Sequence, residues 1–248
     1  MNTELRDIGT IIWKEWREIF AGTGRGGRGI RLLLVVGAIS ILLPLRAGAT
    51  WTESPLPIFF DGFYIPFAFL ITTAANAFAG ERERHTLETL LASRLSDSSI
   101  LLGKIAALSI VGWITGIIGA VLQLVVVNLT SPGQFHVYSG TVAIGIVVAS
   151  LLLSTVIVAV GNLLSQRAST VQQAQQMLTL CFFVLAIIPF VAFELLSNVQ
   201  RANVARWVAT TSPTTLLILG VVILLAIDVL AIGSALVRFR RTIIFQTR

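Results

Sequence analysis

Long apolar stretches alternate with short polar ones along most of this chain. Each apolar stretch approaches or exceeds the roughly 20 residues that a helix needs to cross a bilayer core. We therefore predict an all-α integral membrane protein in which residues 1–248 form a single transmembrane domain with no inserted soluble domain. The six predicted membrane spans are residues 30–49, 56–79, 99–129, 141–164, 171–190 and 214–237.

The N-terminal residues 1–21 have an amphipathic pattern instead of an apolar one. Their apolar side chains recur at helical spacing: Leu5, Ile8, Ile12, Trp16 and Ile19. The charged side chains on the other side are Arg6, Lys14, Arg17 and Glu18. Tryptophans combined with basic groups are typical of a helix that lies in the membrane interface, and we predict such a helix here. A helix packed on a soluble partner is the alternative.

A second amphipathic segment, residues 81–97, separates the second and third predicted spans. Four leucines at spacings of three and four line one face of a predicted helix. They are Leu87, Leu90, Leu91 and Leu95, and Glu81, Glu83, Arg84 and Glu88 lie mostly off that face. A helix of this kind between two spans is suited to bind a partner outside the bilayer.

The connection 191–213, between the fifth and sixth predicted spans, is moderately apolar and is bracketed by Pro189 and Pro213. It is too long for a tight turn and too polar to span. Short helices that re-enter the outer leaflet would satisfy the backbone within protein, and we predict such re-entrant helices here. An ordinary outer loop is the alternative.

Composition and charge support the membrane class and give an orientation. Only 12% of the residues are charged, against roughly 25% in soluble domains. The net charge of +6 could indicate nucleic acid, but the distribution of basic residues explains it better. With both termini in the cytoplasm, all but three of the 18 lysines and arginines lie inside, the exceptions being Arg46, Arg201 and Arg206. This bias predicts that orientation, that residues 81–97 face the cytoplasm, and that no nucleic acid is bound.

The sequence offers little for catalysis. The two histidines, His85 and His136, fall on opposite sides of the predicted bilayer, so they cannot share a metal. Gly103-Lys104 lacks the upstream glycine and the following hydroxyl of a Walker A motif, so ATP cannot bind by that route. The single cysteine, Cys181, excludes an intrachain disulfide. We therefore expect no enzyme activity, metal or cofactor in this chain.

Polar residues inside the predicted spans are the candidate lining of a pathway. Asp228 is the clearest of them, because an ionisable group deep in a span is a functional candidate by default. The other candidates are Asn76, Gln123, Asn162 and Gln176. Each of these side chains could instead hold neighbouring helices together. Both readings stay open at this point.

Residues 78–91, FAGERERHTLETLL, resemble a run found in one transporter family. The membrane subunits of ABC exporters of the second type, the ABC-2 permeases, carry E-[RK]-E-x-x-T-[LM]-E-x-L-L after their second span and Gly-Lys before their third. Gly103-Lys104 matches the latter, and the glutamine-rich start of the fifth span, residues 173–176, is also similar. The chain thus resembles an ABC-2 permease over its whole length.

The resemblance implies a mechanism. Two permease copies, identical or related, would pair in the cell membrane, and each would dock one ABC ATPase subunit through residues 81–97, the coupling helix. ATP and Mg²⁺ would bind to the ATPase, whose closure would switch the spans and export a substrate. The implied docking residues are Glu81, Arg82, Glu83, Arg84, Thr86, Leu87, Glu88 and Leu91.

Two other functions compete with this interpretation. One is a secondary transporter or channel that needs no ATPase, although such proteins often show internal repeats that are not evident here. The other is a structural or assembly protein that recruits an ATPase without moving a substrate. Co-purification of an ATPase tests the first alternative, and reconstituted transport tests the second.

Overall fold

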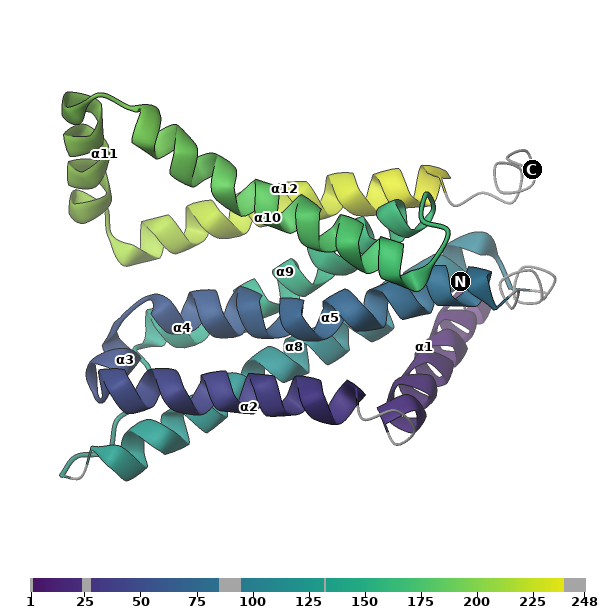
Figure 1. Ribbon diagram of the computed structural model, residues 1–248, viewed down its shortest axis with the longest axis horizontal. Helices are drawn as coiled ribbons and strands as arrows, with labels where there is room; N and C mark the ends of the chain where they lie inside the picture. The colour runs from purple at the N-terminus through teal and green to yellow at the C-terminus, as the bar shows by residue number, and fades with distance from the viewer. Residues whose placement is uncertain (1, 24–27, 85–94, 132, 239–248) are drawn as a thin grey trace.

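The computed structural model describes residues 2–23, 28–84, 95–131 and 133–238, and within these ranges every regular element is helical (Figure 1). The predicted all-α class is therefore confirmed. The elements are α1 (Asn2–Thr23), α2 (Arg28–Ala47), α3 (Thr50–Glu53), α4 (Leu56–Phe59), η1 (Phe60–Tyr64), α5 (Ile65–Ala75), η2 (Asn76–Gly80), α6 (Glu81–Glu83), α8 (Asp97–Thr130), α9 (Gly140–Ser165), α10 (Val171–Leu195), α11 (Asn198–Thr210) and α12 (Pro213–Arg238).

Four helices are long and apolar enough to cross a membrane: Leu56–Glu83, Asp97–Thr130, Gly140–Ser165 and Pro213–Arg238. They coincide with the second, third, fourth and sixth predicted spans. The first of them runs continuously from α4 to α6 and contains two π-helical segments, η1 and η2. The predicted first and fifth spans correspond to α2 and α10, helices of 20 and 25 residues. These two are not among the four, and their crossing of the membrane stays a prediction.

Short hydroxyl side chains determine where several helices begin. Ser96, Ser139, Thr170 and Ser197 each accept a hydrogen bond from the backbone N–H three residues later, so they cap α8, α9, α10 and α11. Such caps satisfy N–H groups that have no partner within the helix. The polar residues between the apolar stretches therefore determine where the following helices begin.

The core of the molecule lies where α8 and α9 pack together and against α5. Glycines on α8 allow this close approach. A Cβ built at Gly112 would lie 2.5 Å from Leu70 Cδ1 on α5, and one at Gly116 would lie 2.4 Å from the carbonyl oxygen of Asp61. The small-residue spacing on α8 therefore serves contacts within this chain.

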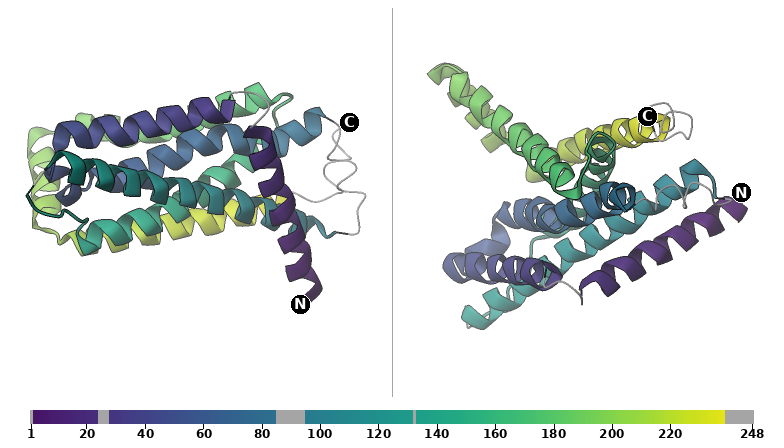
Figure 2. Two further views of the ribbon diagram at one scale, coloured as in Figure 1. Left: turned by 90° about the horizontal axis from the view of Figure 1, so that it is seen from below. Right: turned by 45° about the vertical axis from the view of Figure 1, so that its right-hand side comes forward.

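Helix α1 lies across one end of the other helices (Figure 2, left). It packs on the start of α8, where Ile11 is buried and the Trp16 indole N–H donates to the Ala107 carbonyl at 3.1 Å. Trp13, which is 63% exposed, lies under the Arg17 guanidinium at 5.0 Å from its ring centre. One face of the predicted interfacial helix therefore contacts α8, and an aromatic side chain is left on the outside.

At the opposite end, α10 and α12 diverge toward α11, which connects them (Figure 1). The predicted re-entrant segment 191–213 holds the end of α10 and one further helix, α11. That helix begins at a capping box in which Ser197 and Gln200 exchange side-chain and backbone hydrogen bonds. No residue of α11 is buried. The position of α11 relative to the membrane stays a prediction.

Candidate functional site

A cluster of charged side chains joins α1, α6 and α8 at the end of the molecule where α1 lies. Lys104 of α8 is only 1% exposed, and its Nζ lies 2.8 Å from Glu15 Oε1 of α1 and 2.8 Å from Glu81 Oε1 of α6. The same ammonium donates to the Ala77 carbonyl at 2.9 Å. A buried lysine keeps its charge only when it is paired in this way.

Lys14 of α1 completes the cluster. Its Nζ lies 2.7 Å from Glu81 Oε1, 3.3 Å from Glu15 Oε1 and 3.2 Å from Glu18 Oε1. Burial lowers the pKa of Lys14, but the hydrogen bond to Glu81 and the charges of Glu81, Glu15 and Glu18 outweigh burial, so this pKa is held above its ordinary value. Two lysines thus balance the two buried glutamates.

The three glutamates could be mistaken for a metal site. Single carboxylate oxygens of Glu15, Glu18 and Glu81 lie within 4.8 Å of one another. The Lys14 ammonium, however, contacts all three carboxylates at 3.3 Å or less. The positive charge at this place is therefore supplied by lysine, and the cluster acts as an ion-pair network.

The next two residues of α6 hold the connection between α9 and α10. The Arg82 guanidinium donates to the Gln166 carbonyl at 2.8 Å and to the Ser165 carbonyl, at the C-terminus of α9. Glu83 Oε2 accepts from the Val171 N–H, the first residue of α10, at 3.0 Å. A cation at a helix C-terminus and an anion at a helix N-terminus are both favourable. We call residues Glu81–Glu83 with these contacts the α6 junction.

The structure describes only part of the predicted coupling helix. Glu81 is buried in the ion-pair network, Arg82 and Glu83 bind the ends of α9 and α10, and Arg84 is exposed. The other predicted docking residues, Thr86, Leu87, Glu88 and Leu91, lie outside the described residues. Sequence reasoning did not assign Lys14, Lys104 and Glu15 to this cluster, because their contacts join residues that are up to 89 positions apart.

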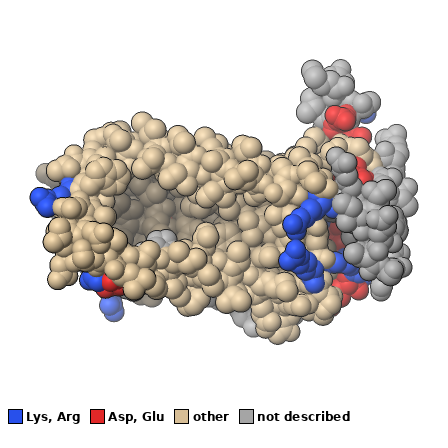
Figure 3. Space-filling view, turned by 90° about the horizontal axis from the view of Figure 1, so that it is seen from above, with Lys and Arg blue, Asp and Glu red and all other residues tan. Residues whose placement is uncertain are grey.

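An open cavity of about 470 Å³ borders α10 and α5. Glutamines lie at the start of α10 and apolar side chains lie farther along it. The lining residues are Ile71, Gln172, Gln175, Gln176, Thr179, Leu180 and Phe183. A broader hollow with uncharged walls is visible in Figure 3, with basic residues toward both ends. The cavity therefore offers amide groups at one end and an apolar surface at the other.

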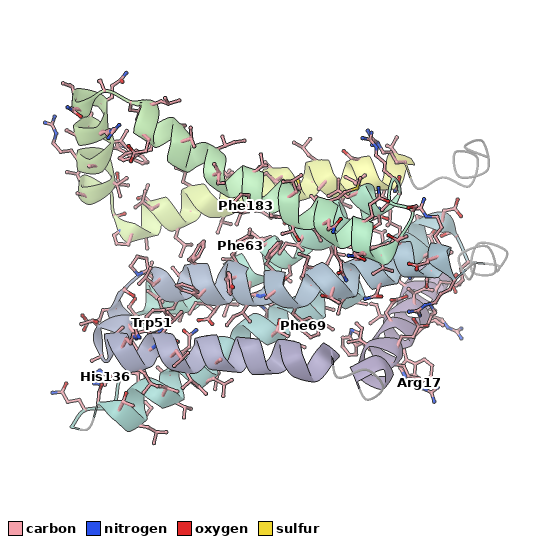
Figure 4. All side chains as sticks on the ribbon, in the orientation of Figure 1. Arg17, Trp51, Phe63, Phe69, His136 and Phe183 are labelled. Atoms are coloured by element: carbon pink, nitrogen blue, oxygen red, sulfur yellow. The ribbon has the colours of Figure 1, made fainter. Side chains whose placement is uncertain are left out.

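Aromatic side chains attach α10 to the helix beside this cavity. The Phe182 ring centre lies 5.2 Å from that of Phe67 and 6.1 Å from that of Phe63. Phe63 belongs to η1 and Phe183 to α10, and both are labelled in Figure 4. Phe182 is buried and packs against the neighbouring helix, whereas the next residue, Phe183, lines the cavity.

Of the five predicted pathway residues, only Gln176 lines this cavity. The Asn76 side chain donates to the Thr72 carbonyl at 2.8 Å, within its own helix. Gln123, Asn162 and Asp228 are buried. Asp228 lies on α12, which packs on α9, and neither carboxylate oxygen has a hydrogen-bond partner among the described residues.

Another buried carboxyl, Asp61, was not singled out from the sequence. Gln123 bridges it to Trp51: the Gln123 Nε2 donates to Asp61 Oδ1 at 3.0 Å, and Gln123 Oε1 accepts from the Trp51 indole at 2.7 Å. All three side chains are buried. An acidic residue within the apolar stretch 56–79 was the signal that could have drawn attention to it. These hydrogen bonds indicate that Gln123 holds neighbouring helices together.

Comparison with known proteins adds one finding to this geometry. A family model described as "ABC-2 family transporter protein" matches residues 58–238, which is more than half of the chain. The match includes the α6 junction and the α10 cavity, and it begins after α1 and α2. A search of curated proteins finds no match.

Proposed function

The chain belongs to the ABC-2 family of transporter proteins, and from this premise we propose that it is the permease subunit of an ATP-driven exporter. Membership makes it a membrane component of an ABC transporter, associated with an ABC ATPase. Outward transport and an assembly of two permeases with two ATPases are our proposal. The match over residues 58–238 is the observation that carries it.

The energy for transport would come from a separate subunit. The chain lacks a Walker A motif, so ATP and Mg²⁺ are assigned to the ATPase partner. The predicted coupling helix, residues 81–97, is the docking element. Glu81, Arg82 and Glu83 have contacts within the chain, so the proposed docking contacts centre on Arg84, Thr86, Leu87, Glu88 and Leu91. In the helix predicted from the sequence, these residues would supply charge on one side and a leucine face on the other.

The pathway is proposed to follow the cavity along α10, between two permease copies. Gln176 and its neighbouring glutamines would contact a substrate through amide groups, while Leu180 and Phe183 would contact its apolar part. Chemistry of this kind suits a substrate with both polar and apolar surfaces. Asn76, Gln123 and Asn162 are assigned to helix packing, and Asp228 stays a candidate for a role in transport.

The proposed topology has six spans, with α2 and α10 crossing the cell membrane along with the four longer apolar helices. Both termini, α1 and the α6 junction would face the cytoplasm. Basic residues support this orientation, since the outer segments carry only Arg46, Arg201 and Arg206. The last two lie on α11, at the end of the molecule opposite the α6 junction (Figure 1).

Charge reversal in the coupling helix tests the proposal. We expect the affinity-tagged chain, purified from its native membrane, to retain an ABC ATPase that mass spectrometry identifies by its Walker A peptide. Glu88→Lys should remove most of that ATPase, because a reversed charge repels the complementary site. Glu53→Lys, at an exposed position of α3, is the matched control and should retain it.

Two results would count against this assignment. An ATPase that binds Glu88→Lys and the control equally would exclude Glu88 from docking. A wild-type chain that moves substrate in vesicles without any ATPase would instead favour the secondary transporter or channel.

A further inference from the structure

The Arg82 and Glu83 side chains connect two parts of the molecule that the proposed function treats separately, the docking element and the cavity along α10. Resting on that proposed function, we infer that Arg82 and Glu83 are positioning residues that carry movement of the coupling helix into α10. Their role would therefore be internal transmission, and not contact with the ATPase.

The first argument is the division of contacts along α6. Three consecutive side chains bind different elements: Glu81 binds α1 and α8, Arg82 binds the end of α9, and Glu83 binds the start of α10. A displacement of this short helix therefore reaches four other helices at once. Arg82 and Glu83 are exposed, but each directs its charged group to the backbone at a helix end of the same chain.

The second argument is the strength and direction of the contacts to α9 and α10. Both involve a charged side chain and a backbone group at a helix end, and such charge-assisted bonds are stronger than neutral ones. Gly80 also lies beside the start of α10, since a Cβ built there would meet the Val171 side chain, at Cγ2, at 3.4 Å, an ordinary van der Waals distance. The beginning of α10 is thus held to α6 by both packing and a hydrogen bond.

The third argument is the position of the cavity relative to this contact. Glu83 holds Val171, and the next residue, Gln172, already lines the cavity. Gln175 and Gln176 follow on the next turn. A shift of Glu83 would therefore move the amide-lined end of the cavity directly, without any intermediate element.

The fourth argument is the irregular helix geometry between α5 and α6. The π-helical segment η2, Asn76–Gly80, separates them. π-helical turns are uncommon and are frequently found at functional sites. This segment lies between α5, which packs on α8 and α9, and the α6 junction. The α6 junction therefore follows directly on an irregular turn, which is where the proposed movement would be taken up.

Cys181 provides a reporter for this transmission. It is the only cysteine in the chain, other residues of the chain leave it uncovered, and it follows the cavity-lining Leu180 on α10. In the purified complex with the ATPase, the rate at which N-ethylmaleimide modifies Cys181 is measured with and without Mg²⁺-ATP. Mass spectrometry of the Cys181 peptide separates this signal from cysteines of the ATPase. We expect the rate to change several-fold on addition of Mg²⁺-ATP.

The variants are chosen to separate transmission from docking and from folding. Arg82→Ala and Glu83→Ala should keep the ATPase bound but lose the nucleotide-dependent change at Cys181. Glu83→Gln retains an oxygen that can accept from the Val171 N–H, so it should keep most of the change. Arg167→Ala removes an exposed charge from the same connection between α9 and α10, and it should behave as the wild type.

Each other outcome overturns the inference in a distinguishable way. If the Ala variants keep the full response at Cys181, the α6 junction does not transmit movement. If they lose the ATPase while Arg167→Ala keeps it, Arg82 and Glu83 are docking residues as the family resemblance implied. If the wild-type complex forms but Cys181 does not respond, α10 is not the moving element. If no ATPase complex forms with the wild type, the proposed function fails together with the inference.

Discussion

Lys104 shows how strongly single residues determine the structure at the end of the molecule where α1 lies. Its ammonium is nearly inaccessible and is neutralised by Glu15 and Glu81. A buried ion pair contributes little when compared with an apolar pair of the same size, but loss of one partner leaves an uncompensated charge. The network therefore makes α1 dependent on α8, although the two helices are separated in the sequence by more than 70 residues.

Substitution of this lysine tests the network. Lys104→Met should lower the free energy of unfolding by about 3–5 kcal/mol, because Glu15 and Glu81 lose a buried cation. The double variant Lys104→Met with Glu15→Gln restores the charge balance and should recover much of that loss. Denaturant titration in detergent, followed by tryptophan fluorescence, measures both. Equal stability of Lys104→Met and the exposed-site control Arg6→Met would contradict the ion-pair assignment.

The charged residues of the Glu81–Arg84 run are evident in the sequence. The partners of Glu81, Arg82 and Glu83 could not be predicted from it. The resemblance to ABC-2 permeases implied that these residues dock an ATPase. Glu81 instead contacts residues 67 and 23 positions away, and Arg82 contacts main-chain carbonyls that carry no sequence signal. Helical periodicity describes one helix, and it does not say which helices meet.

At the scale of elements, the apolar stretches predicted helices that the structure contains, with starts fixed by Ser96, Ser139 and Thr170. The π-helical turns η1 and η2 had no counterpart in the sequence pattern, because such turns depend on tertiary contacts. The connection after α10 was also harder to predict. Its capping box at Ser197 produces one distinct helix, α11, which the mixed apolar and polar pattern did not resolve.

Close packing of α8 gives a prediction at this scale. Gly116→Ala would place a Cβ 2.4 Å from the Asp61 carbonyl oxygen and 2.9 Å from Ser150 Cβ, so helices must separate. We expect a loss of about 1–3 kcal/mol, as is typical of overpacked cores. Gly220→Ala on α12 is the matched control, since nothing lies within 4 Å of its Cβ. It should be neutral or stabilising by up to about 1 kcal/mol through higher helix propensity.

Thermal unfolding of the two alanine variants in the same detergent provides the measurement. Gly116→Ala should unfold at a clearly lower temperature than Gly220→Ala. If both variants unfold together with the wild type, α8 does not pack against η1 and α9 as closely as described.

At the scale of the whole molecule, the family and the helical class followed from the sequence, and the family match and the structure confirm them. The positions of the charged cluster, the cavity and the exposed surface relative to one another were less predictable. Charged contacts gather at the α1 and α6 end, the amide-lined cavity begins one residue beyond the α6 junction, and α12 leaves most of its surface exposed. An exposed apolar helix needs lipid or another protein around it. The exposed surface of α12 is where lipid or a further protein would lie.

The composition of the proposed assembly tests the central claim most directly. Native mass spectrometry of the complex, purified from its own membrane, should give a mass that contains two copies of this 26.8 kDa chain, or one copy and a related permease, together with two ATPase subunits. The same preparation should hydrolyse Mg²⁺-ATP. Assemblies that contain only this chain, with no ATPase and no ATP hydrolysis, would contradict a role as an ATP-driven permease.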